Sequence, residues 1–370
     1  MKRQAVFVRI AFVHDYLNQY GGAERVLEAL HDIAPTAPVY TSIYAAEAMP
    51  SAYATWDIRP SWMQYLPAWR TFFRHYFMLY PMAFGACDLH DYDLVISSSS
   101  AYAKGVRVRP GAVHICYCHT PMRFVWQTDA YVARERIQGV TQHMMRFLLQ
   151  FLRRWDVANS AGVTHFIANS HVVAERIHTF YGRQATIIPP PVDLAPVNTQ
   201  PPGDYLLTGG RLVPYKRIDL AIQACSALNL PLVVFGDGRD KDALMRLAGP
   251  SVRFVGRVSD AQRQELFNGC RAFLFPGEED FGITPLEAMA AGRPVVAYRA
   301  GGALDTVKEG QTGIFFDQQT PEALMTALHA LMRHSWDAHD IRTHAEYFGR
   351  AQFDQRMRAF IRHATGEVTP

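Results

Sequence analysis

The sequence predicts an α/β protein made of two doubly wound domains, and three observations support this prediction. Short β-branched and apolar runs alternate with helix-like segments along the chain, which is typical of parallel sheets with helices on both faces. A chain of 370 residues is longer than one hydrophobic core usually accommodates. Three successive prolines within Ile187–Asp193 interrupt the alternation, because proline continues neither a helix nor a strand ladder.

The first domain is expected at residues 1–190 and the second at residues 191–345. Predicted strands of the first are Val6–Val13, Leu94–Ser97, Val113–Tyr117 and Thr164–Ala168. Those of the second are Tyr205–Thr208, Leu232–Phe235, Val252–Val255, Ala272–Phe275 and Pro294–Tyr298. A break at Gly349 predicts a last helix within 346–370 that returns to the first domain. Because such sheets bind ligands outside the carboxyl ends of their strands, we expect the domains to face each other across a cleft.

Composition narrows the class of protein. Apolar residues form 49% of the chain and charged residues 19%, as in folded globular proteins, and the net charge of +3 is too small to indicate a nucleic-acid partner. Five scattered cysteines indicate a reducing, cytosolic setting rather than a disulfide scaffold. Arg9 interrupts the first apolar run, which favours a buried strand over a signal peptide, and no run of about 18 apolar residues could span a bilayer.

The segment Pro276–Tyr298 carries the clearest functional pattern. It follows a predicted strand, and Thr284–Glu287 reads as a capping box with a proline at the first helical position, so a helix is expected to start there. The free amides at its start would form an anion site suited to a diphosphate. Glu279 and Glu287 flank this turn. Judged alone, Glu287 is equally well explained as the capping-box partner, and Glu279 as a solvated loop carboxylate. The other residues expected to line this site are Phe281, Gly282, Ile283 and Thr284.

A second pattern opens the second domain, in Leu206–Leu220. The pair Gly209–Gly210 follows a strand and permits a tight turn, and Arg211 and Lys216 come before a helix. Two cations at the carboxyl end of a strand suit a diphosphate leaving group. Judged alone, they fit a solvated surface better than a binding site.

Together these segments resemble the glutamate-x7-glutamate motif and the arginine–lysine pair of retaining GT-B glycosyltransferases of the glycosyltransferase 4 type. The first-domain phrases HDYLNQYGGAERV, YDLVISSSSAYAKGV and CYCHTPMRFVW look most like bacterial exopolysaccharide and O-antigen mannosyltransferases. The resemblance covers most of the chain and is more specific in the second domain. It implies that Glu279 lies by the donor-sugar hydroxyls, that Glu287 holds the nucleotide ribose, and that Arg211 and Lys216 neutralise the departing diphosphate.

Further candidate residues come from both domains. Gly21 and Gly22 open a helix after the first strand, so the backbone there can approach a sugar diphosphate. His119 ends a predicted strand, and its His-x-Pro context resembles the family's histidine that contacts the donor sugar. Candidate contacts to an acceptor phosphate are Lys104 and Arg123. The run Gly236–Asp237–Gly238 lacks the third glycine of a dinucleotide fingerprint, so we expect it to line the nucleotide pocket instead. The candidate residues of this pocket are Gly210, Gly236, Asp237 and Val255.

No metal site is expected. Cys116 and Cys118 alternate along a strand with no second Cys/His pair of zinc-site spacing, and zinc is therefore disfavoured. The pair Asp91 and Asp93 resembles the metal-binding aspartates of the other glycosyltransferase fold, but it precedes an apolar strand instead of following one. With fixed cations and helix amides stabilising the leaving diphosphate, the family's front-face mechanism would need no metal.

Two aromatic and basic segments have two possible explanations. Ile58–Cys87 contains no acidic residue, and its aromatic residues recur at helical spacing. Both segments either pack into the core of the first domain or lie on anionic lipid. The first stripe is predicted as one helical face with Leu66, Trp69, Phe73, Tyr76 and Tyr80, and the second contains Met144, Phe147, Phe151 and Trp155, flanked by Arg146, Arg153 and Arg154.

The function expected from this resemblance is transfer of mannose from GDP-mannose to a polyprenyl-diphosphate-linked saccharide, with retention of configuration, in bacterial polysaccharide biosynthesis. The enzyme is expected in the cytoplasm, peripheral on the inner face of the plasma membrane. Other donors stay open, namely UDP-glucose, UDP-N-acetylglucosamine or a UDP-uronic acid. A GT-B-shaped epimerase would need an acid and base set that we do not find, and a non-catalytic binder would be expected to lack some of Arg211, Lys216, Glu279 and Glu287, which are all present.

Overall fold

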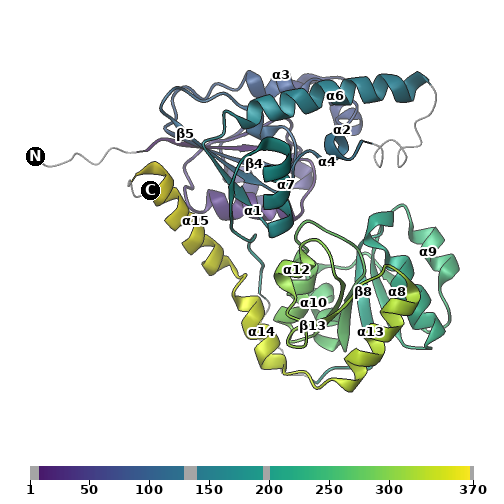
Figure 1. The fold of residues 1–370 in the computed structure, drawn as a ribbon. Helices are drawn as coiled ribbons and strands as arrows, with labels where there is room; N and C mark the ends of the chain where they lie inside the picture. Colours follow the sequence, from purple (N-terminus) through teal and green to yellow (C-terminus); the bar gives the residue numbers. More distant parts are fainter. Residues whose placement is uncertain (1–7, 129–139, 195–200, 367–370) are drawn as a thin grey trace, which may run out of the picture. The chain divides into compact units, whose positions relative to one another are not determined.

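The computed structural model describes residues 8–128, 140–194 and 201–366, and these form two compact units (Figure 1). One unit contains the chain up to Pro190 together with the residues from Phe353 onward, and the other contains Pro191–Gln352. Within the described residues, no helix is long and apolar enough to cross a membrane.

The first unit is built on a seven-stranded parallel sheet of order β3-β2-β1-β4-β5-β6-β7. Its strands are β1 Ile10–His14, β2 Val39–Thr41, β3 Ile58–Pro60, β4 Leu94–Ser99, β5 Val113–Cys118, β6 His165–Ala168 and β7 Ala185–Ile187. The strand order reverses between β1 and β4, which makes this the topological switch point, where doubly wound sheets bind ligands. His14 pairs with Ser98 across this point, so polar side chains from the two strands meet at the carboxyl edge.

Helices cover both faces of this sheet (Figure 1). They are α1 Gly22–His31, α2 Trp69–Phe72, α3 Tyr80–Gly85, α4 Arg123–Trp126, α6 Val140–Ser160, α7 His171–Tyr181 and α15 Arg350–Thr365, with short 3-10 turns at η1 Ala46–Ala48, η2 Ser51–Thr55, η3 Trp62–Tyr65 and η4 Ala103–Gly105. The C-terminal helix α15 contributes Phe353, Met357 and Ile361 to the same hydrophobic core as β1 and α1. The opposite face packs under α3 and α6.

The stripe from Leu66 to Tyr80 does not lie on one helix, so that part of the sequence prediction is wrong. The segment 58–87 forms β3, η3, α2 and α3 in succession, because Pro67 cannot donate a helical hydrogen bond and Ala68 takes a left-handed conformation with φ of 46°. Trp69 and Tyr80 are buried in the core, and Phe73 packs against it. For this stripe the core-packing alternative therefore holds.

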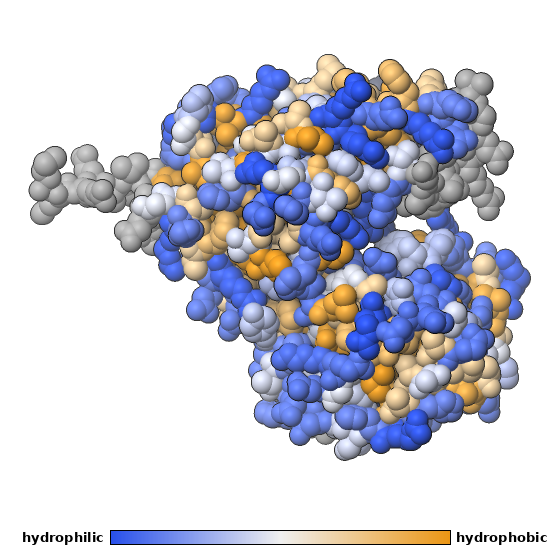
Figure 2. Space-filling model, viewed as in Figure 1, coloured by the Kyte–Doolittle hydropathy of each residue, from blue (hydrophilic) through white to orange (hydrophobic). Residues whose placement is uncertain are grey.

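The second stripe, on α6, behaves differently. Met144, Phe147 and Phe151 are 57%, 71% and 55% exposed, whereas Trp155 packs against the core. Figure 2 shows hydrophobic residues interspersed with hydrophilic ones over the side of this unit where Figure 1 places α3 and α6. The helix α6 thus carries an exposed apolar stripe.

The second unit contains a six-stranded parallel sheet of order β10-β9-β8-β11-β12-β13. Its strands are β8 Leu206–Arg211, β9 Leu232–Asp237, β10 Val252–Gly256, β11 Ala272–Phe275, β12 Val295–Tyr298 and β13 Gly313–Phe316, the last of which was not predicted. Its helices are α8 Ile218–Ala227, α9 Lys241–Leu247, α10 Asp260–Gly269, α11 Ile283–Ala290, α12 Ala303–Thr306, α13 Pro321–Arg333 and α14 Ala338–Glu346, with a 3-10 turn at η5 Pro214–Lys216. The switch point lies between β8 and β11. The prediction of two doubly wound α/β units is confirmed.

Candidate active site

Two of the predicted site residues meet at the switch point of the second sheet. The turn η5 carries Lys216 back over the end of β8, and Glu279 lies in the loop that follows β11. The Nζ of Lys216 is 2.7 Å from the Oε1 of Glu279, with both side chains largely shielded from solvent. A Cβ added at Gly210 would lie 3.4 Å from this Nζ, so the bare backbone of Gly210 leaves room beside the ammonium.

The loop around Glu279 is held by the turn that follows β12. The amide of Gly302 donates to the Glu279 carbonyl over 2.8 Å, and a Cβ at Gly301 would lie 2.3 Å from that same oxygen. Gly301 has φ of 60°, a conformation that side chains disfavour. Only glycine fits this close approach, so the loop can rest directly on the turn.

The ends of β8 and β9 are packed equally tightly. A Cβ at Gly236 would lie 1.8 Å from the carbonyl oxygen of Gly210, and Gly236 has φ of 106°. Beyond this contact, Arg211 donates from Nη2 to the hydroxyl of Tyr215 over 3.2 Å. Asp237 accepts from its neighbour's amide and lies 3.2 Å from the Nε of Arg257. These charged groups line the carboxyl edge of the sheet, and Val255 lies near the end of the neighbouring strand β10.

The start of α11 differs from the sequence prediction. The helix begins at Ile283, its N-cap is Gly282 with φ of 86°, and no side chain caps it, so the predicted capping box is wrong. Glycine enters this left-handed conformation easily, which lets the helix begin before Thr284 can act as its cap. Glu287 instead lies 3.2 Å from the Nη2 of Arg263 on α10, and its carboxylate faces a cation from another element.

His119 lies at the carboxyl edge of the first sheet, directly after β5. Its Nε2 is 2.8 Å from the Oγ of Ser98, and Ser98 lies 3.1 Å from the Nδ1 of His14. Burial and the nearby His14 lower the pKa of His119 to about 3, which keeps its imidazole neutral near pH 7. Gly21 is the N-cap of α1 and has an extended backbone conformation, and Gly22 is the first residue of the helix.

Lys104 cannot meet an acceptor phosphate, and this prediction is wrong. Its ammonium is buried, pairs with the carboxylate of Asp156 and donates to the carbonyl of Ala101 over 2.8 Å. Burial opposes the charge of Lys104, but the carboxylate of Asp156 raises the pKa of Lys104 overall. Asp156 also accepts from Trp126 and Tyr181, each over 2.8 Å, so the pair joins η4, α4, α6 and α7. Arg123, the other acceptor candidate, is the first residue of α4 and is partly buried.

The predicted zinc alternative was Cys116, Cys118 and His119. Both thiols are free and buried, and hydrogen bonding to Cys116 together with burial raises the pKa of Cys118 well above its usual value. Over the described ranges 8–128, 140–194 and 201–366, no group of three or more His, Cys, Asp or Glu side chains is arranged to hold a metal ion.

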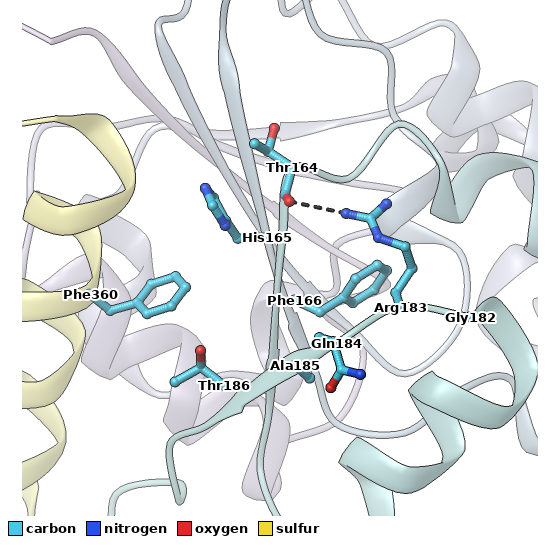
Figure 3. A pocket seen from close by; sticks show the side chains of 9 residues that line it. All are labelled: Thr164, His165, Phe166, Gly182, Arg183, Gln184, Ala185, Thr186 and Phe360. Carbon is cyan, nitrogen blue, oxygen red and sulfur yellow. Dashed lines mark hydrogen bonds between the residues drawn. The ribbon is translucent and has the colours of Figure 1, made fainter.

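The described residues of the first unit line cavities at both ends of its strands. One of about 500 Å³ opens at the amino ends of β6 and β7, where Arg183 donates to the Thr164 carbonyl and Phe360 of α15 forms one wall (Figure 3). His119 lies at the other end of the strands, where their carboxyl ends meet. The other, of about 260 Å³, adjoins the loop between β1 and α1 and is lined by Asn18, Gln19, Ala45, Glu47, Ala48, Trp69, Arg70, Phe73 and Arg74.

Several polar residues at these sites were missed from the sequence. His14 contacts both Ser98 and Glu24 near His119, and Arg70 and Arg74 line the second cavity. His14 and Ser98 could have been found from the sequence, because each directly follows a predicted strand and the carboxyl ends of parallel strands share one sheet edge. Arg70 and Arg74 lie within Ile58–Cys87, a segment for which the sequence left core packing and lipid contact as alternatives.

Two family models divide the chain at the boundary between the units. "Glycosyltransferase Family 4" matches residues 20–196, and "Glycosyl transferases group 1" matches residues 195–348. The chain belongs to the group 1 and family 4 glycosyltransferases. Solved structures with the same fold include Anabaena HepE in complex with UDP, with a TM-score of 0.69, 18% identity and coverage of 96% of this chain and 100% of that one. Sucrose-phosphate synthase from Thermosynechococcus elongatus matches with a TM-score of 0.70, 17% identity and coverage of 96% and 99%. This glycosyltransferase therefore has the GT-B fold.

Curated relatives match over shorter stretches. The GDP-mannose-dependent alpha-mannosyltransferase of Mycolicibacterium smegmatis is 35% identical over 119 residues, which is 32% of each chain. The sulfoquinovosyl transferase SQD2 of Arabidopsis thaliana is 30% identical over 177 residues, covering 46% of this glycosyltransferase and 33% of the plant protein. The match thus spans about a third of the length of these relatives.

Proposed function

We propose that this glycosyltransferase moves mannose from GDP-mannose to a lipid-linked oligosaccharide, with retention of configuration, in bacterial polysaccharide biosynthesis. The observation that carries the proposal is the Lys216–Glu279 ion pair at the switch point of the second sheet. Ligands of doubly wound sheets bind at this place, and the pair offers both a cation for phosphate and a carboxylate for sugar hydroxyls. The name of the mycolicibacterial relative supports mannose as the transferred sugar.

In this proposal the second unit binds the nucleotide sugar. An ammonium has three N–H donors, so Lys216 can contact Glu279 and still donate to phosphate oxygens. With Arg211 and the uncapped start of α11, it would stabilise the charge that develops on the leaving diphosphate. Glu279 would accept from donor-sugar hydroxyls and Glu287 from the ribose. Gly236, Asp237 and Val255 would line the nucleotide pocket, and the reaction would need no metal.

The first unit would provide the remaining groups. His119 would contact a donor-sugar hydroxyl, and the backbone at Gly21 and Gly22 would approach the sugar diphosphate. Since Lys104 is committed to Asp156, the cavity beside the β1–α1 loop is the better candidate for the acceptor. This cavity is lined by the guanidinium groups of Arg70 and Arg74, which join Arg123 as candidate contacts to the acceptor phosphate. The leaving phosphate would take the acceptor proton.

The exposed stripe on α6 supports a lipid-linked acceptor. Met144, Phe147 and Phe151 recur at spacings that place them on one helical face, and Arg146 and Arg154 are exposed on the same helix. Apolar residues beside cations suit an interfacial helix on an anionic bilayer. We therefore place the enzyme at the inner face of the plasma membrane, bound peripherally.

A donor screen tests the proposal. The full-length protein is heated with GDP, UDP, GDP-mannose and UDP-sugars, and the thermal shift is followed by an assay of nucleotide release with polyprenyl-diphosphate saccharide. The largest shift with GDP-mannose, and release of GDP only when acceptor is present, would support it. Preference for a UDP-sugar would support the alternative donors, of which UDP-glucose is bound in a solved HepE structure. Change of the donor sugar without acceptor would indicate an epimerase, and binding without turnover would indicate a non-catalytic binder.

A further inference from the structure

Four polar side chains form a line across the carboxyl edge of the first sheet. Glu24 from the first turn of α1 lies 3.4 Å by Oε1 from the Nε2 of His14, at the end of β1. The Nδ1 of His14 is 3.1 Å from the Oγ of Ser98 on β4, and that Oγ is 2.8 Å from the Nε2 of His119, after β5. Glu24, His14 and Ser98 are 4%, 2% and 0% exposed, so water does not compete for these contacts.

The chemistry of the four groups determines which one donates and which one accepts at each hydrogen bond of the line. An ionised carboxylate can only accept, and Glu24 lies in the first turn of α1, where the helix dipole favours its negative charge. The Nε2 of His14 must then carry the proton. A neutral imidazole has a single N–H, so the Nδ1 of a neutral His14 accepts from the Ser98 hydroxyl. The Ser98 oxygen is left to accept from His119.

This order of hydrogen-bond donors and acceptors ends at His119, whose ring contacts the donor sugar in the proposed function. His119 must donate from Nε2 to Ser98, and its ring is neutral, so Nδ1 keeps a lone pair. The backbone of His119 is fixed independently, because its amide donates to the Ser99 carbonyl over 2.9 Å and its carbonyl accepts from Asn169 over 3.0 Å. The line therefore sets the tautomer of the ring and not the position of the residue.

We propose that Glu24, His14 and Ser98 are positioning residues that hold His119 as its Nε2–H tautomer, so that Nδ1 accepts a hydrogen bond from a donor-sugar hydroxyl and cannot donate one. The sugar part of this inference rests on the proposed function, but the tautomer does not. It predicts selection for a sugar with a hydrogen-bond donor at that position. A donor analogue with fluorine or hydrogen in place of that hydroxyl would leave Nδ1 without a partner.

The tautomer can be measured without any activity. Protein labelled with ¹⁵N-histidine is examined by long-range ¹H–¹⁵N correlation at pH 8, and the His14 and His119 signals are assigned from His14→Gln and His119→Gln. We expect His119 to show the Nε2–H pattern. In Glu24→Gln the side-chain amide can donate as well as accept, so we expect the Nδ1–H form of His119 to appear. Ser98→Ala, which breaks the line at another point, should have the same effect. Glu28→Gln is the matched control, one turn further along α1, where the carboxylate accepts from the Tyr20 hydroxyl at the surface.

Kinetics separate this inference from the proposed function. We expect Glu24→Gln to lower kcat/KM for the donor roughly tenfold, the loss of about one hydrogen bond, while Glu28→Gln stays at the wild-type value. A wild-type His119 with an Nδ1–H or imidazolium pattern would overturn the inference, as would unchanged tautomers in both Glu24→Gln and Ser98→Ala. The expected tautomers in a protein that transfers no sugar would refute the proposed function alone.

Discussion

Lys216 and Glu279 form an ion pair across the switch point of the second sheet, with Nζ 2.7 Å from Oε1. One residue follows β8 and the other follows β11, and these strands are neighbours only because the strand order reverses there. The pair therefore arises from the topology and not from closeness in the sequence. It brings a cation and a carboxylate to the edge where such sheets bind nucleotides.

Removal of this cation should slow the reaction more than it weakens the fold. We expect Lys216→Ala to lower kcat on the order of a hundredfold or more, because a shielded positive charge is lost where negative charge develops. The measurement is steady-state nucleotide release at saturating donor. Lys308→Ala, which removes an exposed lysine of the same unit, is the control and should match the wild type. Wild-type turnover in Lys216→Ala would remove this residue from the site.

The exposed stripe on α6 should be required for membrane binding. We expect Met144→Ser/Phe147→Ser/Phe151→Ser to bind vesicles containing anionic lipid more weakly than the wild type in co-sedimentation. Binding should also weaken with salt, since surface attraction is screened over about 8 Å at physiological ionic strength. Met245→Ser/Leu247→Ser changes residues of α9 that are 50% and 46% exposed, and it should bind as the wild type does. Equal binding by both variants would show that α6 is not the lipid-facing element.

The first unit should lose stability in mild acid. Burial lowers the pKa of His114 to about 4 from the usual value of 6.5, so the unfolded chain binds the extra proton between these values. The contribution of His114 is then fully present well above pH 6.5 and falls as the pH drops, by roughly 2 kcal/mol at pH 5, in addition to any loss from His119. Urea unfolding at pH 7.5 and pH 5 measures this, and His114→Gln should reduce the difference. The exposed His90→Gln is the control, and an unaltered difference in His114→Gln would contradict the assignment.

The buried pair of Lys104 and Asp156 should show strong coupling in unfolding experiments. We expect Lys104→Met to lower the free energy of unfolding by roughly 3–5 kcal/mol, because the Asp156 carboxylate is left buried without its cation. Adding Asp156→Asn should recover part of this loss, since the amide oxygen can still accept from Trp126 and Tyr181. A double variant that is less stable than Lys104→Met would contradict this account.

The sequence predicted two doubly wound units and most of their strands, because alternating apolar and helical segments are local patterns. Lys216 and Glu279 were selected by the family resemblance, since the sequence alone explained them equally well or better as solvated residues. It failed where tertiary contacts decide the outcome. Lys104 looked like an exposed cation, since its partner Asp156 is 52 residues away in the chain. The capping box at Thr284 was overridden by Gly282, whose left-handed conformation starts the helix earlier. The contact of His14 with Glu24 depends on how α1 packs beside β1, which no local pattern specifies.

Transfer of radiolabelled mannose from GDP-mannose to a polyprenyl-diphosphate-linked saccharide tests the central claim most directly. The account predicts an α-linked mannosyl lipid with the wild-type protein and about a hundredfold less with Lys216→Ala. If no GDP- or UDP-sugar yields a glycosylated lipid, or if Lys216→Ala forms product at the wild-type rate, the account is contradicted.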